Sequence, residues 1–255
     1  MNLLVKQNGP IYSVRLNRPD VRNAFDDATI EELTTTFRNV PEDARVVMLS
    51  GEGKVFCAGG DLNWMRRTAN YTEEENLRDA EALAGLFLAV DECPAPVVAV
   101  VQGAAFGGGL GLVSVSDVVI AEEGAKFCFS EVKLGLVPSV ISQFALRKIG
   151  ESAARRYFVT AEVFDAIEAH RIGLVHRVVP ADELEAAAQE IVNAILSNGP
   201  NAVKTAKRLI RELRGKSVSE AVALSTRTIA SARASEEGQE GVSAFLEKRK
   251  PSWQQ

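Results

Sequence analysis

The sequence predicts an α/β core followed by a C-terminal helical part. Short β-branched runs alternate with helical patterns in the first half of the chain, and most of the sequence from Gly150 onward has helical periodicity. This order of elements is typical of an α/β domain with an appended helical region. We therefore expect a core over residues 1–199 and a helical part over residues 200–255.

Strands are expected where short runs rich in β-branched residues are bounded by turn residues. The runs in the first half are 11–16, 45–50, 95–103, 117–121 and 126–130. Between the first two runs, a helix is indicated by apolar residues at helical spacing, namely Ile30, Leu33 and Phe37.

Segment 72–90 predicts a long helix, because it opens with a capping box from Thr72 to Glu75. Four of its residues share one helical face and should be buried: Leu77, Ala80, Ala84 and Phe87.

The second half contains one predicted strand, 174–179, and then a helix over 181–200 that ends at Gly199 with Pro200 beyond it. Three more helical stretches follow, up to residue 253. Such an appendage often serves assembly or covers an active site.

Composition and charge exclude several classes of function. The 255-residue chain has 46% apolar residues, ample for a buried core, and a net charge of −5 that argues against nucleic acid or an anionic membrane as its main partner. The first twenty residues lack the apolar core of a signal peptide. The longest apolar run, 83–90, is too short to span a bilayer, so we expect a cytoplasmic protein.

The cysteines and histidines predict no metal site. Cys57, Cys93 and Cys128 stand alone in apolar contexts without CxxC or Cys/His spacing, so we expect buried, reduced thiols. His170 and His176 lie in a periodic apolar stretch, which favours a structural role.

Two glycine-rich turns, 56–62 and 102–112, each follow a predicted strand and lead into a helix-like segment. A helix start exposes unpaired N–H groups at the positive end of the helix dipole. One N–H from each turn, aimed at a common point, would form an oxyanion hole. The alternative is that the glycines only permit close helix–strand packing. Walker A, dinucleotide-binding and nucleophile-elbow patterns fit poorly, because their defining residues are missing or misplaced.

Glu131 is the candidate general acid/base. It follows apolar strand residues and precedes more apolar sequence, so partial burial should raise its pKa toward a useful range. The alternative is an exposed glutamate at a strand end. Asp61 and Asp117 have the character of helix-cap or turn residues.

Three segments together resemble the crotonase (enoyl-CoA hydratase/isomerase) superfamily: "FCAGGDL", "PVVAVVQGAAFGGGLGL" and "DVVIAEEGAKFCFSEVKLGLVPS". "LNRPDVRNAFD" near the start and "FLEKRKPSW" near the end extend the resemblance over essentially the whole chain. The resemblance implies a spiral of repeated ββα units and a C-terminal helical region that forms a trimer, or a dimer of trimers. It also implies an acyl-CoA thioester substrate and no separate cofactor.

Individual residues acquire roles from the same resemblance. The N–H groups of Gly60 and Gly108 would bind the thioester oxygen, and Glu131 would transfer protons. Lys248 of a neighbouring subunit would approach the adenosine phosphate region of CoA. The remaining CoA contacts would come from Arg22, Ala24, Ala58, Asp61 and Leu62.

Gly111 departs from the family's hydratases, which typically carry a glutamate three residues beyond the oxyanion glycine. A hydratase would therefore use Glu131 with another water-orienting group. The segments "NWMRR" and "FSEVKLGLVPSVIS" resemble bacterial methylglutaconyl-CoA hydratases, in which Arg66 or Arg67 would pair with a distal carboxylate. An isomerase that moves a double bond from position 3 to position 2 would need Glu131 alone. A non-catalytic acyl-CoA-binding homologue would keep the fold without turnover.

Overall fold

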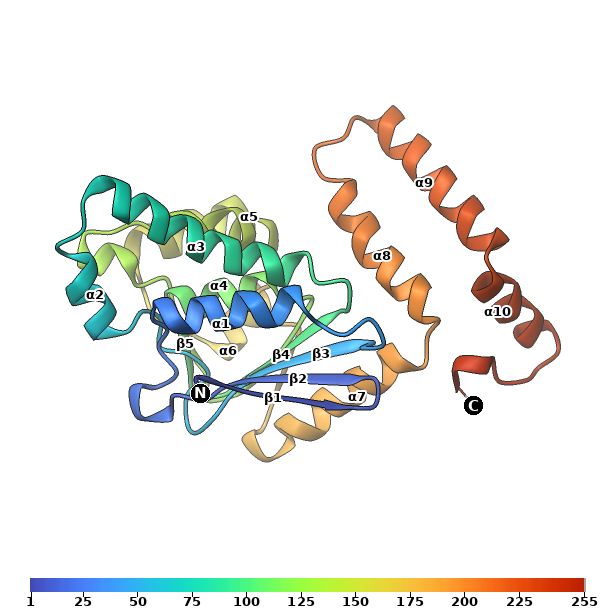
Figure 1. Cartoon of the computed structure of the whole chain (residues 1–255), viewed down its shortest axis with the longest axis horizontal. Helices are drawn as coiled ribbons and strands as arrows, with labels where there is room; N and C mark the ends of the chain where they lie inside the picture. The colour runs from blue at the N-terminus through green and yellow to red at the C-terminus, as the bar shows by residue number, and fades with distance from the viewer. Residues whose placement is uncertain (255) are drawn as a thin grey trace.

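Two β-sheets form the centre of the protein, in a computed structural model that describes residues 1–254 (Figure 1). The larger sheet comprises β1 (Leu3–Asn8), β2 (Ile11–Leu16), β3 (Val46–Gly51), β4 (Val97–Val101), β6 (Val118–Glu122) and β9 (Arg177–Val179), in that spatial order. The smaller sheet comprises β5 (Ala104–Phe106), β7 (Lys126–Cys128) and β8 (Phe164–Asp165). β1 pairs antiparallel with β2, and the other neighbours in the large sheet are parallel.

Consecutive strands pass from the large sheet to the small one, and a helix returns the chain. β4 leads into β5 and then into α4 (Gly108–Val115), and β6 leads into β7 and then α5 (Ser139–Thr160). The unit before them runs from β3 through Cys57, which forms a bridge with Ala105 of β5, to α2 (Leu62–Thr68) and α3 (Glu73–Asp91). The predicted spiral of ββα units is confirmed.

The helices beside the larger sheet bury their predicted apolar faces only in part. α1 (Asp27–Arg38) buries its predicted face. The capping box of α3 is present, but Leu77 is 58% exposed and burial in this helix begins at Leu86. The predicted face is wrong in the first half of α3, because that half extends past the core toward α2 (Figure 1).

Several elements differ from the prediction. β1 was not expected, although Gly9-Pro10 is the two-residue loop between Asn8 and Ile11, and the positive φ of Gly9 (54°) suits the first position of such a hairpin loop. The expected strand 174–179 begins only at Arg177. The expected strand 126–130 ends at Cys128. Gly199 does not end a helix: α7 (Leu184–Leu196) has already stopped, and Gly199 caps the start of α8 (Pro200–Glu212). Pro200 suits the first helical position because it needs no N–H partner there.

The three predicted C-terminal helices are α8, α9 (Val218–Ala234) and α10 (Glu236–Leu246), and they extend as an arm away from the sheets (Figure 1). α8 and α9 bury no residue in the single chain. The arm exposes a set of apolar side chains: Ile210, Val218, Val222, Ile229, Val242, Phe245 and Leu246. The short helix α6 (Ala166–Arg171) stays with the core. Within residues 1–254, no helix has the length and apolar character needed to cross a membrane.

Candidate active site

The first glycine turn lies against the segment that precedes α1. The N–H of Phe25 donates to the carbonyl of Gly59 (2.8 Å), and the carbonyl of Phe25 accepts from the N–H of Asp61 (2.8 Å). These bonds pair Phe25 with Gly60, and they leave the N–H of Gly60 itself free to point elsewhere. Gly59 has a φ of 96°, and a Cβ there would lie 2.9 Å from the carbonyl oxygen of Phe106, so the turn requires glycine.

The second turn leads into α4. The N–H of Gly107 donates to the carbonyl of Cys128 (3.0 Å). Gly108 is the first residue of α4, a position whose N–H has no partner inside a helix. In the part of the chain that the structure describes, no carbonyl of a turn or loop accepts from the N–H of Gly60 or of Gly108. Both donors are available to a ligand.

The two turns touch each other. A Cβ on Gly109 would lie 2.6 Å from the carbonyl oxygen of Cys57, and a Cβ on Gly108 would lie 2.5 Å from Cε2 of Phe25. The glycines therefore do permit close packing, as the alternative predicted. The same packing brings the start of α4 against the first turn, which is the arrangement an oxyanion hole needs.

Glu131 faces the second turn. It opens a short 3-10 helix (Glu131–Leu134) after β7, and its Oε1 lies 3.6 Å from the position of a Cβ on Gly107. Its Oε2 is buried and has no hydrogen-bond partner among the described residues. Burial raises the pKa of this carboxyl, as the sequence predicted. Because an unpaired buried carboxylate oxygen is costly, its presence here is typical of a functional group.

Gly111 has no room for any side chain. A Cβ there would lie 2.5 Å from Cε1 of Phe87 and 2.8 Å from Cγ2 of Ile141. Phe87 is fully buried and packs edge-on against Phe144. The place of the missing glutamate is therefore filled by apolar groups.

Gly111→Ala should lower the free energy of unfolding by about 1–3 kcal/mol, because the added methyl overpacks a rigid aromatic contact. Gly85→Ala is the matched control: Gly85 also lies inside a helix, α3, but its nearest neighbour is Nη2 of Arg38 at 3.8 Å. That change should stabilise by roughly 0.5–1 kcal/mol. Urea unfolding of both variants measures the difference, and equal stabilities would show that Phe87 moves aside freely.

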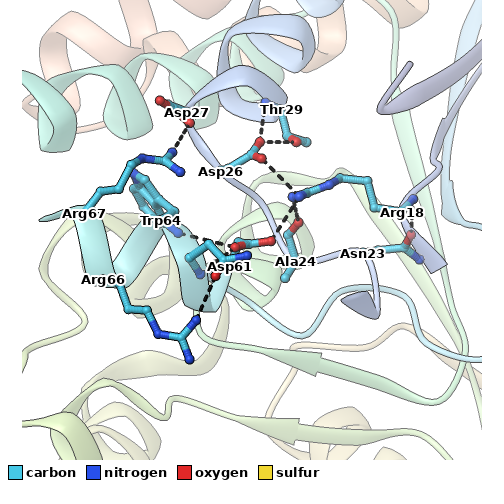
Figure 2. A network of polar contacts seen from close by, with 11 residues as sticks. Arg18, Asn23, Ala24, Asp26, Asp27, Thr29, Asp61, Trp64, Arg66 and Arg67 are labelled. Atoms are coloured by element: carbon cyan, nitrogen blue, oxygen red, sulfur yellow. Dashed lines mark hydrogen bonds and ion pairs between the residues drawn. The ribbon is translucent and has the colours of Figure 1, made fainter. Parts of the chain in front are cut away.

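Five of the six residues expected to contact CoA come together beside the first turn. The N–H of Ala58 donates to the carbonyl of Arg22 (3.0 Å), and Leu62, which opens α2, is exposed. The buried carboxylate of Asp61 is already used: it caps α2 and pairs with Arg18 (Figure 2). Asp61 is confirmed as a helix cap, so a ligand would meet its backbone rather than its side chain.

Lys248 is not part of this group in the single chain. It follows α10, which lies at the opposite end of the molecule from α2 (Figure 1). A neighbouring copy would have to supply it, as the family resemblance implies.

Arg66 and Arg67 lie on the exposed side of α2 (Figure 2). Arg67 forms an ion pair with Asp27 (2.6 Å), and Arg66 donates to Asn63 (2.8 Å). Both guanidinium groups thus already have partners at the surface.

The remaining candidates have structural roles. Asp117 is a turn residue between α4 and β6 rather than a helix cap; it accepts from the N–H of Val97 and forms an ion pair with Lys207. The ring of His170 bonds the carbonyl of Val175, and that of His176 accepts from the N–H of Val119. The three cysteines are buried and free. Residues 1–254 hold no group of three or more His, Cys, Asp or Glu side chains suited to a metal ion.

Arg18 was not among the residues predicted from the sequence, yet its side chain lies between the first turn and α1 (Figure 2). An arginine inside the turn sequence "LNRPD" was the only available signal, because its partners lie up to 43 residues away.

Comparison with known proteins places this geometry in one family. Residues 6–255 match the model of the enoyl-CoA hydratase/isomerase family. A short-chain-enoyl-CoA hydratase of Clostridium acetobutylicum is 33% identical over 257 residues, covering 98% of this chain and 96% of the relative. The crystal structure of an enoyl-CoA hydratase from Shewanella pealeana is 45% identical, with a TM-score of 0.94 and coverage of 99% of this chain and 96% of that one. AtuE of Pseudomonas aeruginosa is 36% identical, with a TM-score of 0.97 and full coverage of both chains. The chain belongs to the enoyl-CoA hydratase/isomerase family.

Proposed function

We propose that the protein hydrates 2-enoyl-CoA thioesters. The observation that carries the proposal is the buried, unpaired carboxylate oxygen of Glu131 beside the turn that presents the N–H of Gly108. The names of the Clostridium relative and of the Shewanella structure support the same reaction.

The mechanism uses two N–H donors and one carboxylate. The N–H groups of Gly60 and Gly108 bind the thioester oxygen and stabilise the enolate that forms when water adds to the β-carbon. Glu131 accepts a proton from that water as the new C–O bond forms. It then returns a proton to the α-carbon, so that the enolate collapses to the 3-hydroxyacyl thioester. A raised pKa suits a group that must act first as base and then as acid.

We propose branched enoyl groups, 3-methylglutaconyl-CoA among them, as the preferred substrates. This choice is supported by the resemblance of the segments around Arg66 and Glu131, and by the absence of a second carboxylate at Gly111. A substrate with its own carboxylate could supply the polar group that the apolar contacts of Phe87 and Ile141 leave out.

The test follows the ultraviolet absorbance of the conjugated enoyl thioester with purified protein. Falling absorbance with crotonyl-CoA or 3-methylglutaconyl-CoA is expected, and the relative kcat/KM values report the acyl preference. If folded protein at high concentration hydrates neither compound, the hydratase proposal is wrong.

Double-bond isomerisation is a second candidate, and the filled space at Gly111 favours it. Moving a double bond from position 3 to position 2 needs one group to carry a proton between two carbons of the same enolate, and Glu131 suffices. A 3-enoyl-CoA should then give rising absorbance. With substrate dideuterated at C2, deuterium found at C4 of the product would show that a single carboxylate carries the proton between the two carbons.

We also propose that the protein assembles into a trimer or a dimer of trimers through the C-terminal arm. The exposed apolar side chains of α9 and α10, Phe245 and Leu246 foremost, support this. Light scattering should give a mass that is a multiple of three chains. Phe245→Asp should lower that mass and, because Lys248 would be lost from the neighbour's site, raise KM. Gln189→Asp on α7 adds the same charge away from the arm and should leave the mass unchanged.

A further inference from the structure

Arg18 joins the starts of two helices through one guanidinium group (Figure 2). Its Nη2 lies 3.0 Å from Oδ2 of Asp26 and 3.0 Å from Oδ2 of Asp61. Asp26 uses its other oxygen to cap α1, accepting from the N–H of Thr29 (2.9 Å). Asp61 likewise caps α2 with Oδ1. Each aspartate thus divides its two oxygens between a helix end and Arg18.

The third contact of Arg18 completes its hold on the segment around Phe25. Nη1 donates to the carbonyl of Ala24, so Arg18 binds the residue before Phe25 and, through Asp26, the residue after it. The side chain of Arg18 is largely buried, and Asp61 is nearly inaccessible. Hydrogen bonds to charged groups are strong when water is excluded, so this contact should be rigid.

Phe25 is in contact with both proposed oxyanion donors. Its backbone pairs with Gly60, and its ring edge lies against the Cα of Gly108, where a Cβ would approach to 2.5 Å. Any displacement of Phe25 would change the separation of the two N–H groups. The position of Phe25 is in turn set by the groups that Arg18 binds on either side of it.

We propose that Arg18 is a positioning residue for the oxyanion hole. It clamps segment 24–26 to Asp61, so that Phe25 holds the N–H groups of Gly60 and Gly108 at the separation that one thioester oxygen requires. The inference rests on the proposed function only in naming the thioester. The clamp itself is geometry within this chain.

The test uses Arg18→Met, which keeps the length of the side chain and removes its donors, and Arg18→Lys. The single ammonium of lysine lacks the planar fork by which Arg18 reaches Ala24 with one nitrogen and both aspartates with the other. Misplacement of catalytic groups by about 1 Å can cost about 10²-fold, so we expect kcat with crotonyl-CoA to fall about that much while KM stays within a few-fold. Arg15→Met is the matched control, because Arg15 forms an exposed ion pair with Glu52 and touches neither turn.

A spectroscopic readout separates the clamp from turnover. Butyryl-CoA labelled with ¹³C at the carbonyl cannot be hydrated, and hydrogen bonds to its oxygen lower the infrared C=O frequency. The bound wild-type complex and the Arg15→Met complex should show the full downshift, and the Arg18 variants a smaller one. A full downshift and unchanged kcat in folded Arg18 variants would overturn the proposal, even if their thermal stability falls.

The same measurements distinguish failure of the clamp from failure of the proposed reaction. If the wild-type protein lowers the C=O frequency of bound butyryl-CoA but hydrates no substrate, the proposed reaction is wrong. The C=O frequencies of the Arg18 variants then still test the clamp. If both Arg18 variants fail to fold, Asp26→Asn weakens one arm of the clamp and keeps an oxygen to cap α1. It should then show a partial loss of the downshift, and a full downshift in that variant would overturn the proposal.

Discussion

Glu131→Gln should reduce hydration of 2-enoyl-CoA by about 10²- to 10⁴-fold, the usual contribution of a general acid/base. The amide keeps the shape of the side chain but can neither take a proton from water nor return one to the α-carbon. Substrate affinity should change little, because in the proposed mechanism backbone N–H groups bind the thioester oxygen. Steady-state kinetics with crotonyl-CoA and direct titration with butyryl-CoA measure the two quantities separately.

The pH dependence should identify the same group. Burial raises the pKa of Glu131 above 4.5, so the acidic limb of the kcat profile should have its midpoint above that value. The residual activity of the variant should lack this limb. Glu123→Gln, an exposed change in the turn after β6, should keep both the rate and the profile. A wild-type-like profile in Glu131→Gln would remove Glu131 from the chemistry.

Glu131 should also lower stability at neutral pH. Between pH 4.5 and its raised pKa, the folded state holds more protons on this group than the unfolded state does. The free energy of unfolding therefore falls as pH rises through that window. Glu131→Gln removes this dependence, so the variant should melt at a higher temperature than the wild type at pH 7 and approach it at acidic pH.

Gly108→Pro should cost about 10²- to 10³-fold in kcat/KM relative to Gly108→Ala, the loss expected for one oxyanion donor. Proline is accepted at the first position of a helix and removes the N–H of that residue. Alanine adds a comparable Cβ against Phe25 but retains the donor, so it corrects for the crowding. The two variants together isolate a single backbone hydrogen bond.

The control for this pair is binding of free CoA, which has no thioester carbonyl and should bind both variants equally. Rates are compared below the unfolding temperature of each protein, because the clash with Phe25 will lower stability in both. Equal kcat/KM in the two variants would mean that the N–H of Gly108 does not bind the reacting oxygen.

The local parts of the site could be predicted from the sequence. The two glycine turns and the buried Glu131 each come after a strand that local composition predicts, and the caps at Thr72 and Asp61 depend on residues within one helical turn. Such features arise from backbone geometry near the residue itself. The resemblance to a known family assigned these features to one site and suggested the reaction.

The long-range parts could not be predicted, because they depend on which segments meet. The sequence indicates only that Gly111 lacks the glutamate of the family's hydratases, and the packing of α3 and α5 on α4 is needed to show that Phe87 and Ile141 fill the space beside it. The exposure of Leu77 was hidden for the same reason: periodicity marks an apolar face but not how far the core extends beneath it. The role of Arg18 required the approach of segments around 24 and 61.

The small sheet sets the distance between the carboxylate of Glu131 and the glycine turn that precedes α4. Phe106 is in register with Cys128, Gly107 is bonded to that same residue, and Glu131 follows three positions later. Phe127 stacks on Phe164, and Phe129 packs against Phe158, so the strand carrying the carboxylate rests on an aromatic layer. α2 and α5 belong to neither ladder of strands. We expect substitutions in these two helices to change the space for the acyl group while leaving the spacing between Glu131 and the N–H of Gly108 unaltered, so that selectivity and reactivity can vary independently.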